Sequence, residues 1–209
     1  MSSRNRSATH DPSEVTSRPR QGPPVSSLAR GRIVGSLILL AFPLYGGGSA
    51  LVTSDSDLRW WGAALVLLNC AGVVVIGLVA RPVVARTHPG AAVTYLLTRV
   101  FEGLVLAVSL VLVLRDEPAA ADRAYWIAMT GLGLGSVFFC WALLQARLIP
   151  RLLAVWGIAG YAILAVGGLL ELSGPDVGLV LSAPGGLFEV VFGVLLVVRG
   201  FPGQAPRPA

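Results

Sequence analysis

The apolar run over residues 91–114 limits the fold of this chain more than any other feature, because two charged residues interrupt it. A helix of about 20 residues spans the hydrocarbon core of a bilayer, and this run is long enough. Arg99 and Glu102 stand three positions apart inside it. A charge at that depth costs about 3 kcal/mol or more unless it is paired or faces protein. The run therefore predicts a membrane-spanning helix that other helices surround.

Five further apolar runs of similar length accompany it, and the composition agrees with a membrane protein. Apolar residues make up 55% of the 209 residues and charged residues 13%, which excludes an ordinary soluble domain. We expect an all-α integral membrane protein, a bundle of six transmembrane helices. The expected spans cover residues 33–52, 60–80, 91–114, 125–144, 152–172 and 179–198. Pro43 and the glycines at 46–48 predict a kink in the first span.

Charged residues divide unevenly between the two ends of the expected helices. The N-terminal segment, the links 81–90 and 145–151 and the C-terminal segment hold twelve arginines, whereas the three opposite links hold three arginines and seven acidic residues. Loops rich in basic residues stay in the cytoplasm during membrane insertion. The sequence therefore predicts that both termini are cytoplasmic (N-in/C-in). The same arginines could contact anionic lipid headgroups, but retention during insertion accounts for them more simply.

The chain divides into three expected regions. Residues 1–29 are rich in Arg, Pro and Ser and predict a disordered cytoplasmic tail, residues 30–201 form the six-span membrane domain, and residues 202–209 form a flexible C-terminal tail. Basic residues followed by the apolar block 33–44 also resemble a cleavable signal peptide. Because the basic segment is unusually long for a signal peptide, we favour an uncleaved first span.

The polar side chains of the run 91–114 share one helix face. At about 100° per residue, they all fall within about 140° of arc. They are Thr94, Tyr95, Thr98, Arg99, Glu102 and Ser109. We expect Tyr95, Thr98 and Ser109 to supply hydrogen bonds beside the two charges. This polar face predicts an interior site around Arg99 and Glu102.

Glu189 is the only other ionisable residue at depth in an expected span. Its helix face otherwise carries small residues, which lets another backbone approach. At about 1.5 Å per residue, Arg99, Glu102 and Glu189 lie roughly 12–16 Å from the cytoplasmic helix ends. We therefore predict that Arg99 bridges Glu102 and Glu189 and holds the third and sixth spans together. Asn69, in the second span, is expected to form an interhelical hydrogen bond rather than to contact a ligand.

These three charged residues support two hypotheses. One arginine and two glutamates leave a formal surplus of one negative charge, which a bound proton or a cationic ligand would relieve. The first hypothesis is a small-ligand or proton-linked binding protein of transport type that uses Arg99, Glu102 and Glu189. The second is a non-catalytic membrane subunit or assembly partner in which the same charges only fix helix packing. Water access to the glutamates would favour the first, and a dry, fully paired trio the second.

Motifs for catalysis, cofactors and metals are missing from the sequence. It contains no HExxH, GxSxG or Walker A motif, and its only histidines are His10 and His88. Cys70 and Cys140 lie in apolar runs and are expected to pack as small apolar residues. The sequence thus predicts no catalytic residue, cofactor or metal, and favours a non-enzymatic role over an intramembrane enzyme. The expected partners are the lipid bilayer and an unidentified small ligand or a proton, with no nucleic acid; no oligomeric state is specified.

Three short elements resemble a known family. They are Arg99-Val100-Phe101-Glu102, the segment 146–157 with Arg147, Pro150 and Trp156, and Phe188-Glu189 followed by Arg199-Gly200-Phe201. Their order and spacing are similar to those of bacterial membrane proteins known as domain of unknown function 4386, over residues 30–201. The resemblance implies an uncharacterised multi-pass protein of the bacterial inner (cytoplasmic) membrane with about six spans. No activity comes with it.

Overall fold

The computed structural model describes residues 27–54 and 57–201. The tail expected over residues 1–29 lies outside the described residues except for residues 27–29, which belong to a helix. The tail expected over residues 202–209 and Asp55 also lie outside the described residues. Within the described part every long element is a helix, and six helical segments are long and apolar enough to cross a membrane. The expected all-α fold with six spans is therefore confirmed.

The helices follow the expected spans closely. Their bounds are α1 Ser27–Phe42, η1 Pro43–Gly47, α2 Gly48–Val52, α3 Arg59–Val84, α4 Pro89–Leu114, α5 Pro118–Gln145, α6 Arg151–Ser173 and α7 Gly178–Arg199. The segments α1, η1 and α2 together make the first span, which begins at Ser27, a few residues before the expected boundary at residue 30. The other helices also extend beyond the apolar runs into the polar links, because a helix does not end where hydrophobicity does.

Proline and glycine explain where several helices begin and end. Pro89 and Pro118 open α4 and α5, at positions where the missing N–H leaves no bond unmade. Gly174 and Gly200 follow α6 and α7 with positive φ angles of 127° and 66°. A residue with a side chain rarely adopts such angles, so these glycines terminate their helices.

The expected kink in the first span is a π-helical turn. Pro43 is the first residue of η1, the wider turn that connects α1 to α2. Proline has no N–H and its ring clashes with the carbonyl of the preceding turn. A π-helical turn absorbs this local distortion without ending the helix. The first span is thus continuous but has a changed register after Phe42.

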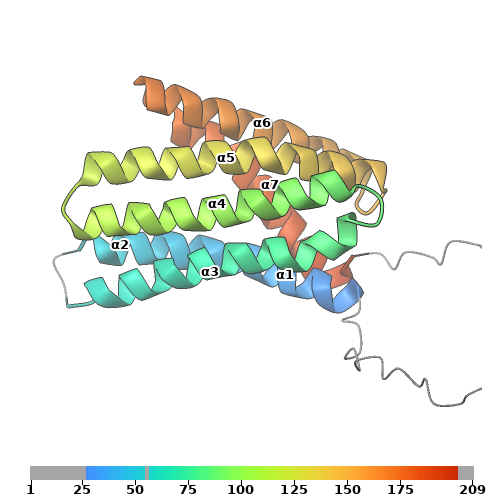
Figure 1. The fold of residues 1–209 in the computed structure, drawn as a ribbon, viewed down its shortest axis with the longest axis horizontal. Coiled ribbons are helices and arrows are strands. Elements are labelled where there is room, and N and C mark those ends of the chain that lie inside the picture. Colours follow the sequence, from blue (N-terminus) through green and yellow to red (C-terminus); the bar gives the residue numbers. More distant parts are fainter. Residues whose placement is uncertain (1–26, 55–56, 202–209) are drawn as a thin grey trace, which may run out of the picture.

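The helices form a closed ring. Each span packs against the next in sequence, in the order α1, α3, α4, α5, α6 and α7, and α7 returns to pack against α1 (Figure 1). Glycines bring α1 and α7 into close contact. A Cβ atom added at Gly35 would lie 2.5 Å from the carbonyl oxygen of Gly193, and one at Gly31 would lie 2.5 Å from Gly200 Cα. Closure of the ring gives the fold an interior lined by several helices.

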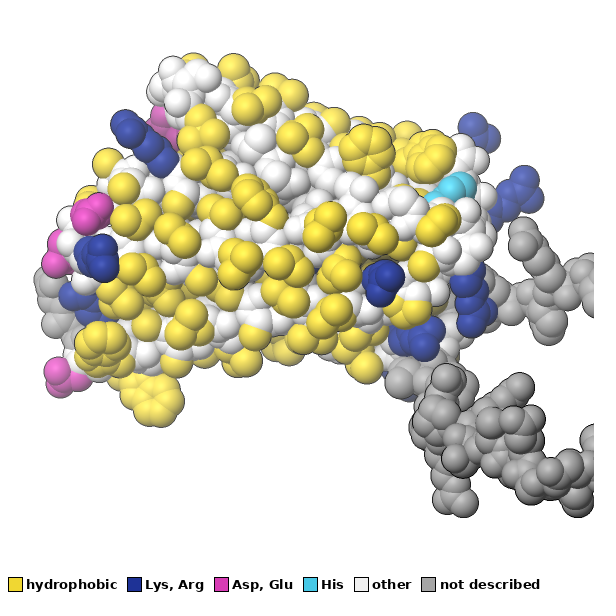
Figure 2. All heavy atoms as spheres, viewed as in Figure 1, with side chains coloured by type: hydrophobic (Ala, Val, Ile, Leu, Met, Phe, Trp, Pro, Cys, Tyr) yellow, Lys and Arg dark blue, Asp and Glu magenta, His cyan; other side chains and the backbone are white. Residues whose placement is uncertain are grey.

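The surface divides into an apolar belt with charged ends. In Figure 2 hydrophobic side chains cover the length of the visible face, acidic side chains gather at one end, and most arginines lie at the other. The described ends of the chain, α1 and Gly200, meet at the arginine-rich end. This distribution is that of a multi-pass membrane protein. Its N-in/C-in orientation stays a prediction.

Candidate functional site

Most of the expected polar face of α4 is buried. Arg99 is only 3% exposed, and four of the five other polar residues expected on this face are also buried. The four are Tyr95, Thr98, Glu102 and Ser109, whereas Thr94 is exposed on the outside of the bundle. Their burial follows from the sequence pattern, because polar side chains avoid lipid whenever a protein interior is available.

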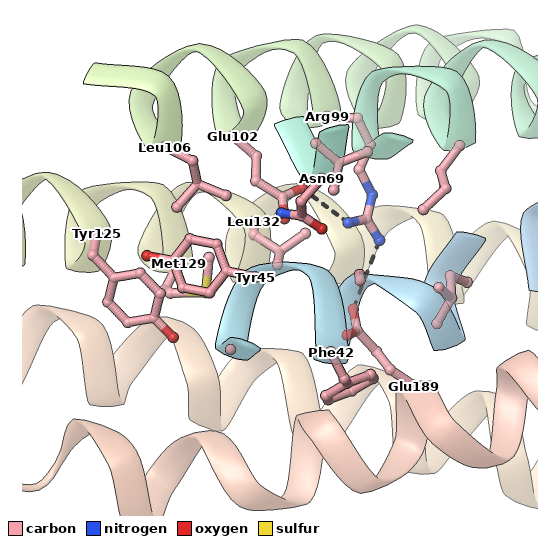
Figure 3. Close-up of a pocket in the computed structure, with 15 residues that line it drawn as sticks. Phe42, Tyr45, Asn69, Arg99, Glu102, Leu106, Tyr125, Met129, Leu132 and Glu189 are labelled. Atoms are coloured by element: carbon pink, nitrogen blue, oxygen red, sulfur yellow. Dashed lines mark hydrogen bonds and ion pairs between the residues drawn. The ribbon is translucent and has the colours of Figure 1, made fainter. Parts of the chain in front are cut away.

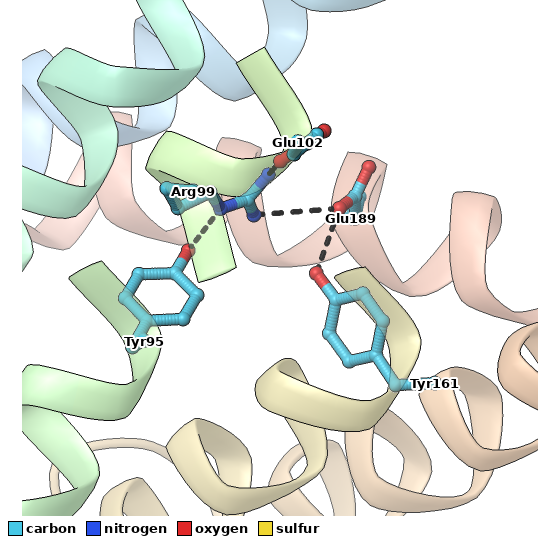
Figure 4. A network of polar contacts seen from close by, with 5 residues as sticks. All are labelled: Tyr95, Arg99, Glu102, Tyr161 and Glu189. Carbon is cyan, nitrogen blue, oxygen red and sulfur yellow. Dashed lines mark hydrogen bonds and ion pairs between the residues drawn. The ribbon is translucent and has the colours of Figure 1, made fainter. Parts of the chain in front are cut away.

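Arg99 is held mainly by residues of its own helix (Figure 4). Its Nη1 donates to Glu102 Oε2 at 2.9 Å, and its Nε donates to the Tyr95 hydroxyl oxygen at 3.0 Å. Tyr95 is itself fixed by stacking on Phe139 of α5, with ring centroids 3.8 Å apart. The guanidinium is therefore oriented by its own helix and by the support of α5 for the Tyr95 ring.

Glu189 of α7 approaches the same guanidinium from the opposite side of the interior. Its Oε1 lies 3.7 Å from Arg99 Nη2, which is an ion pair but too long for a hydrogen bond. The hydroxyl of Tyr161, on α6, donates to the same Oε1 at 2.7 Å. The structure thus brings Arg99, Glu102 and Glu189 together and adds Tyr161 to them.

Tyr161 is the member that sequence reasoning missed. The signal was present, since a tyrosine deep in an apolar span needs a partner for its hydroxyl. The pair with Glu189 could not be predicted, because the two residues lie 28 positions apart and on different helices. Tyr161 and Glu189 meet because α6 and α7 are packed neighbours, with Gly160 against Gly185.

Helices α4 and α7 meet differently from the expectation. We expected their polar faces to hold the two spans together, but α4 packs between α3 and α5, and α7 packs between α6 and α1. The glycines beside Glu189 are used for these neighbours, Gly185 for α6 and Gly193 for α1. Arg99 reaches Glu189 across the interior because its side chain is long. The contact joins side chains and not helix backbones.

Two supporting residues lie apart from the charges. Ser109 donates to the Ala121 carbonyl oxygen of α5 at 2.9 Å. Thr98 packs against Gly135 of α5, in a groove on the outside of these two helices. Among the described residues, neither side chain hydrogen-bonds to Arg99, Glu102 or Glu189. They join α4 to α5, whereas Tyr95 alone of the expected supporting residues contacts Arg99.

A cavity of about 240 Å³ reaches the charged groups from the interior (Figure 3). Four polar side chains line one part of it: Asn69 of α3, Arg99, Glu102 and Glu189. Aromatic and aliphatic side chains line the remainder, among them Phe42, Tyr45, Leu106, Tyr125, Met129 and Leu132. This volume exceeds the space of a single water several times over. It is large enough for a small organic molecule.

Two buried polar atoms on this cavity have no hydrogen-bond partner. Within the described residues they are Arg99 Nη2 and Asn69 Oδ1. The expected interhelical hydrogen bond of Asn69 is therefore wrong, although the residue is only 4% exposed. Buried polar groups are almost always satisfied, and a site that leaves a donor and an acceptor open is suited to hold water or a ligand.

Tyr45 and Tyr125 lie at the end of the cavity away from Arg99 (Figure 3). Their rings stack with centroids 5.5 Å apart and an interplanar angle of 18°. Tyr45 belongs to the π-helical turn η1, so the local distortion at Pro43 sets the position of this ring. The stack joins η1 to α5 at the aromatic end of the cavity.

Comparison with known proteins finds one family match, in the C-terminal part of the chain. Residues 118–200 match the family model described as Domain of unknown function (DUF4386). The match contains Tyr161 and Glu189 and two elements of the resemblance, 146–157 and Phe188-Glu189 with Arg199-Gly200, while Arg99 and Glu102 lie outside it. No curated protein and no solved structure matches the chain. Residues 118–200 are thus similar to the domain of unknown function 4386 family, in agreement with the resemblance of the short elements that lie in this part of the chain.

Proposed function

We propose that this integral membrane protein binds a small ligand inside the cytoplasmic membrane, in the cavity at Arg99, Glu102 and Glu189, and that it is of transport type. The ligand or a proton balances the surplus carboxylate. The cavity itself carries this proposal, because it reaches all three charged residues. A site that only fixed helix packing would be expected to be close-packed, without a cavity of this volume.

The lengths of the contacts also favour binding over packing. The short bonds of Arg99 go to Tyr95 and Glu102 on the same helix, and these cannot hold two helices together. The contact between α4 and α7 is the long one, at 3.7 Å. Glu189 is 18% exposed in its side chain, unlike the buried Glu102. A clamp would show the reverse pattern, with its shortest bonds between helices.

The charge distribution supports the proposed orientation in the membrane. Twelve arginines lie on the segments at one end of the spans, which supports insertion with that end in the cytoplasm. The cavity then opens within the bilayer, at a depth where transport proteins commonly place their binding sites.

Thiol labelling tests whether the cavity holds water. Cys70 and Cys140 are first replaced by alanine, and Met129→Cys is introduced as a reporter on the cavity wall. In native membrane vesicles, 2-aminoethyl methanethiosulfonate should label this cysteine at least about tenfold faster than a cysteine in a dry setting, because only a hydrated thiol ionises readily. The measurement is the labelling rate by mass spectrometry.

Two positions on the same helix provide the controls. Leu143→Cys places the thiol in the packed core outside the cavity, where the native residue is fully buried, and Leu134→Cys places it on the lipid-facing surface. If the labelling rate of Met129→Cys did not exceed the rates of the two controls, water would not reach the cavity. The packing role would then replace the proposed function.

A further inference from the structure

The charges around the cavity do not balance. Arg99 provides one positive charge, and Glu102 and Glu189 provide two negative charges. Glu102 already receives a hydrogen bond from Arg99 at 2.9 Å. Within the part of the chain that the structure describes, Glu189 receives a hydrogen bond only from the neutral Tyr161, and it lies 3.7 Å from Arg99. Glu189 is therefore the carboxylate whose charge is least compensated, and it is also the more exposed of the two.

The open hydrogen-bonding groups at this end include an acceptor that requires a donor. Asn69 Oδ1 is buried and has no partner within the described residues, and it lies beside Glu102 and Arg99 in Figure 3. A protonated amine carries N–H donors and a positive charge together. It would satisfy the amide oxygen and compensate Glu189 at the same end of the cavity, and a water bound beside it would serve Arg99 Nη2.

The remaining wall suits an apolar substituent. Phe42, Tyr45 and Tyr125 supply three aromatic rings, and Leu106, Met129 and Leu132 supply aliphatic and thioether surface. Aromatic faces attract cations, and their bodies pack against apolar groups. Phe42 is 42% exposed and a Cβ at Gly46 would meet no atom within 4 Å, so the wall at η1 is open on the lipid side. A ligand that partitions into the membrane can enter there.

Other ligand classes fit these groups less well. An anion would meet two carboxylates, one of them uncompensated, and like charges at short range in a membrane interior are strongly unfavourable. A neutral ligand would leave the surplus charge in place. A proton alone would remove the charge but would leave the cavity of about 240 Å³ without an occupant.

We propose that the cavity binds a protonated primary or secondary amine with an apolar or aromatic substituent. The ammonium group lies at Glu189 and the polar end, and the substituent lies among Phe42, Tyr45 and Tyr125. This inference rests on the proposed function, since it names the ligand class of the same cavity. Glu189 acts as the counter-ion of the ligand, and Arg99 with Glu102 forms the neutral wall beside it.

Three probes of similar size test the ligand class. They are 2-phenylethylammonium, the uncharged 2-phenylethanol and the anionic 3-phenylpropanoate, titrated onto the purified full chain in detergent at neutral pH. We expect the ammonium to bind at least about tenfold more tightly than the alcohol, because a charge-assisted hydrogen bond adds to the contacts that both make. We expect no measurable binding of the carboxylate. Calorimetry provides the affinities.

Matched substitutions distinguish binding of the probes in the cavity from their partition into the detergent. Glu189→Gln should weaken binding of the ammonium at least about tenfold and leave the alcohol unchanged. Glu117→Gln is the control, because it removes an exposed carboxylate at a helix start far from the cavity and leaves partition into detergent unaltered. Asn69→Leu is a second variant, used where Glu189→Gln does not purify as a folded protein. It should weaken binding of the ammonium about fivefold and binding of the alcohol less, because the charged donor makes the stronger hydrogen bond to the amide oxygen.

The outcomes separate the two proposals. Equal affinities for ammonium and alcohol, or no binding of the ammonium while Met129→Cys is labelled, would overturn the amine class and leave a water-filled binding cavity. Failure of all three probes together with no labelling of Met129→Cys would overturn the proposed function as well. Tight binding of the ammonium that Glu189→Gln abolishes supports both.

Discussion

The two carboxylates beside Arg99 have different surroundings, and replacing each by a neutral residue should therefore change the stability of the protein by different amounts. Glu102 is buried and bonds to Arg99 at 2.9 Å, while Glu189 lies at 3.7 Å and is partly exposed to the cavity. Breaking a buried pair leaves the partner charge uncompensated, which typically costs several kcal/mol. A long, partly exposed pair contributes much less.

Substitution by glutamine measures this difference at the residue scale. Glu102→Gln should destabilise the detergent-solubilised protein by about 3 kcal/mol, because it leaves the Arg99 charge without its close partner. Glu189→Gln should cost less than about 1 kcal/mol, because its pair with Arg99 is longer and partly exposed. Denaturant unfolding followed by helix content provides both values. If Glu189→Gln lowered the free energy of unfolding more than Glu102→Gln, the result would favour the hypothesis that the charges only hold helices together.

At the scale of elements, the crossing of α1 and α7 closes the ring and thereby forms the cavity. The crossing depends on the absence of side chains at its contact points. A Cβ at Gly35 would lie 2.5 Å from Gly193 O and 2.9 Å from Leu196 Cβ, and neither neighbour is the flexible end of a side chain. One methyl group is therefore enough to force the two helices apart.

Alanine substitution tests this crossing against a matched helical glycine. Gly35→Ala should destabilise the protein by about 2 kcal/mol through overpacking of α1 against α7. Gly72→Ala is the control, because a Cβ there meets only Leu37 Cδ2 at 3.8 Å. Since alanine is the better helix former, Gly72→Ala should leave stability unchanged or raise it by up to about 1 kcal/mol. Thermal melting in detergent compares the two, and equal effects would contradict the close crossing.

For the whole molecule, the division of charge between the two ends predicts the orientation in the membrane. The end of α3 with the turn that follows it and the turn from α5 to α6 lie at the same end of the bundle as both described ends of the chain (Figure 1). These segments carry Arg81, Arg86, Arg147 and Arg151. The opposite end carries Asp116, Glu117 and Asp122. Both termini should therefore face the cytoplasm, with the link between α4 and α5 outside.

Reporter fusions test this orientation. A fluorescent protein fused after Ala209 should fluoresce, since it folds in the cytoplasm, and alkaline phosphatase at the same position should be inactive. Phosphatase inserted after Asp116 should be active, because that link is expected outside. Activity of phosphatase after Ala209 would contradict a cytoplasmic C-terminus, and inactivity after Asp116 would contradict an outer link between α4 and α5.

The pattern of residues was sufficient to predict the six spans and the depth of the charges. Runs of apolar residues predict spans because an unpaired backbone group in lipid is so costly that only a helix satisfies it. The same periodicity placed Tyr95, Arg99 and Glu102 on one face, and helix rise placed Glu189 at their depth. These inferences need only the local geometry of one helix at a time.

Contacts between helices could not be predicted in the same way. Tyr161 joins Glu189 because α6 packs on α7, and Ser109 bonds to α5 instead of joining the charges. The cavity, the open amide of Asn69 and the stack of Tyr45 on Tyr125 depend on the ring closure and on the π-helical turn. The sequence by itself determined an all-α membrane protein with three charges at one level, because hydrophobic length and helical period are local properties. Only the tertiary structure decided which helices face one another across the interior and what space they leave there, because packing depends on the shapes of residues far apart in the chain.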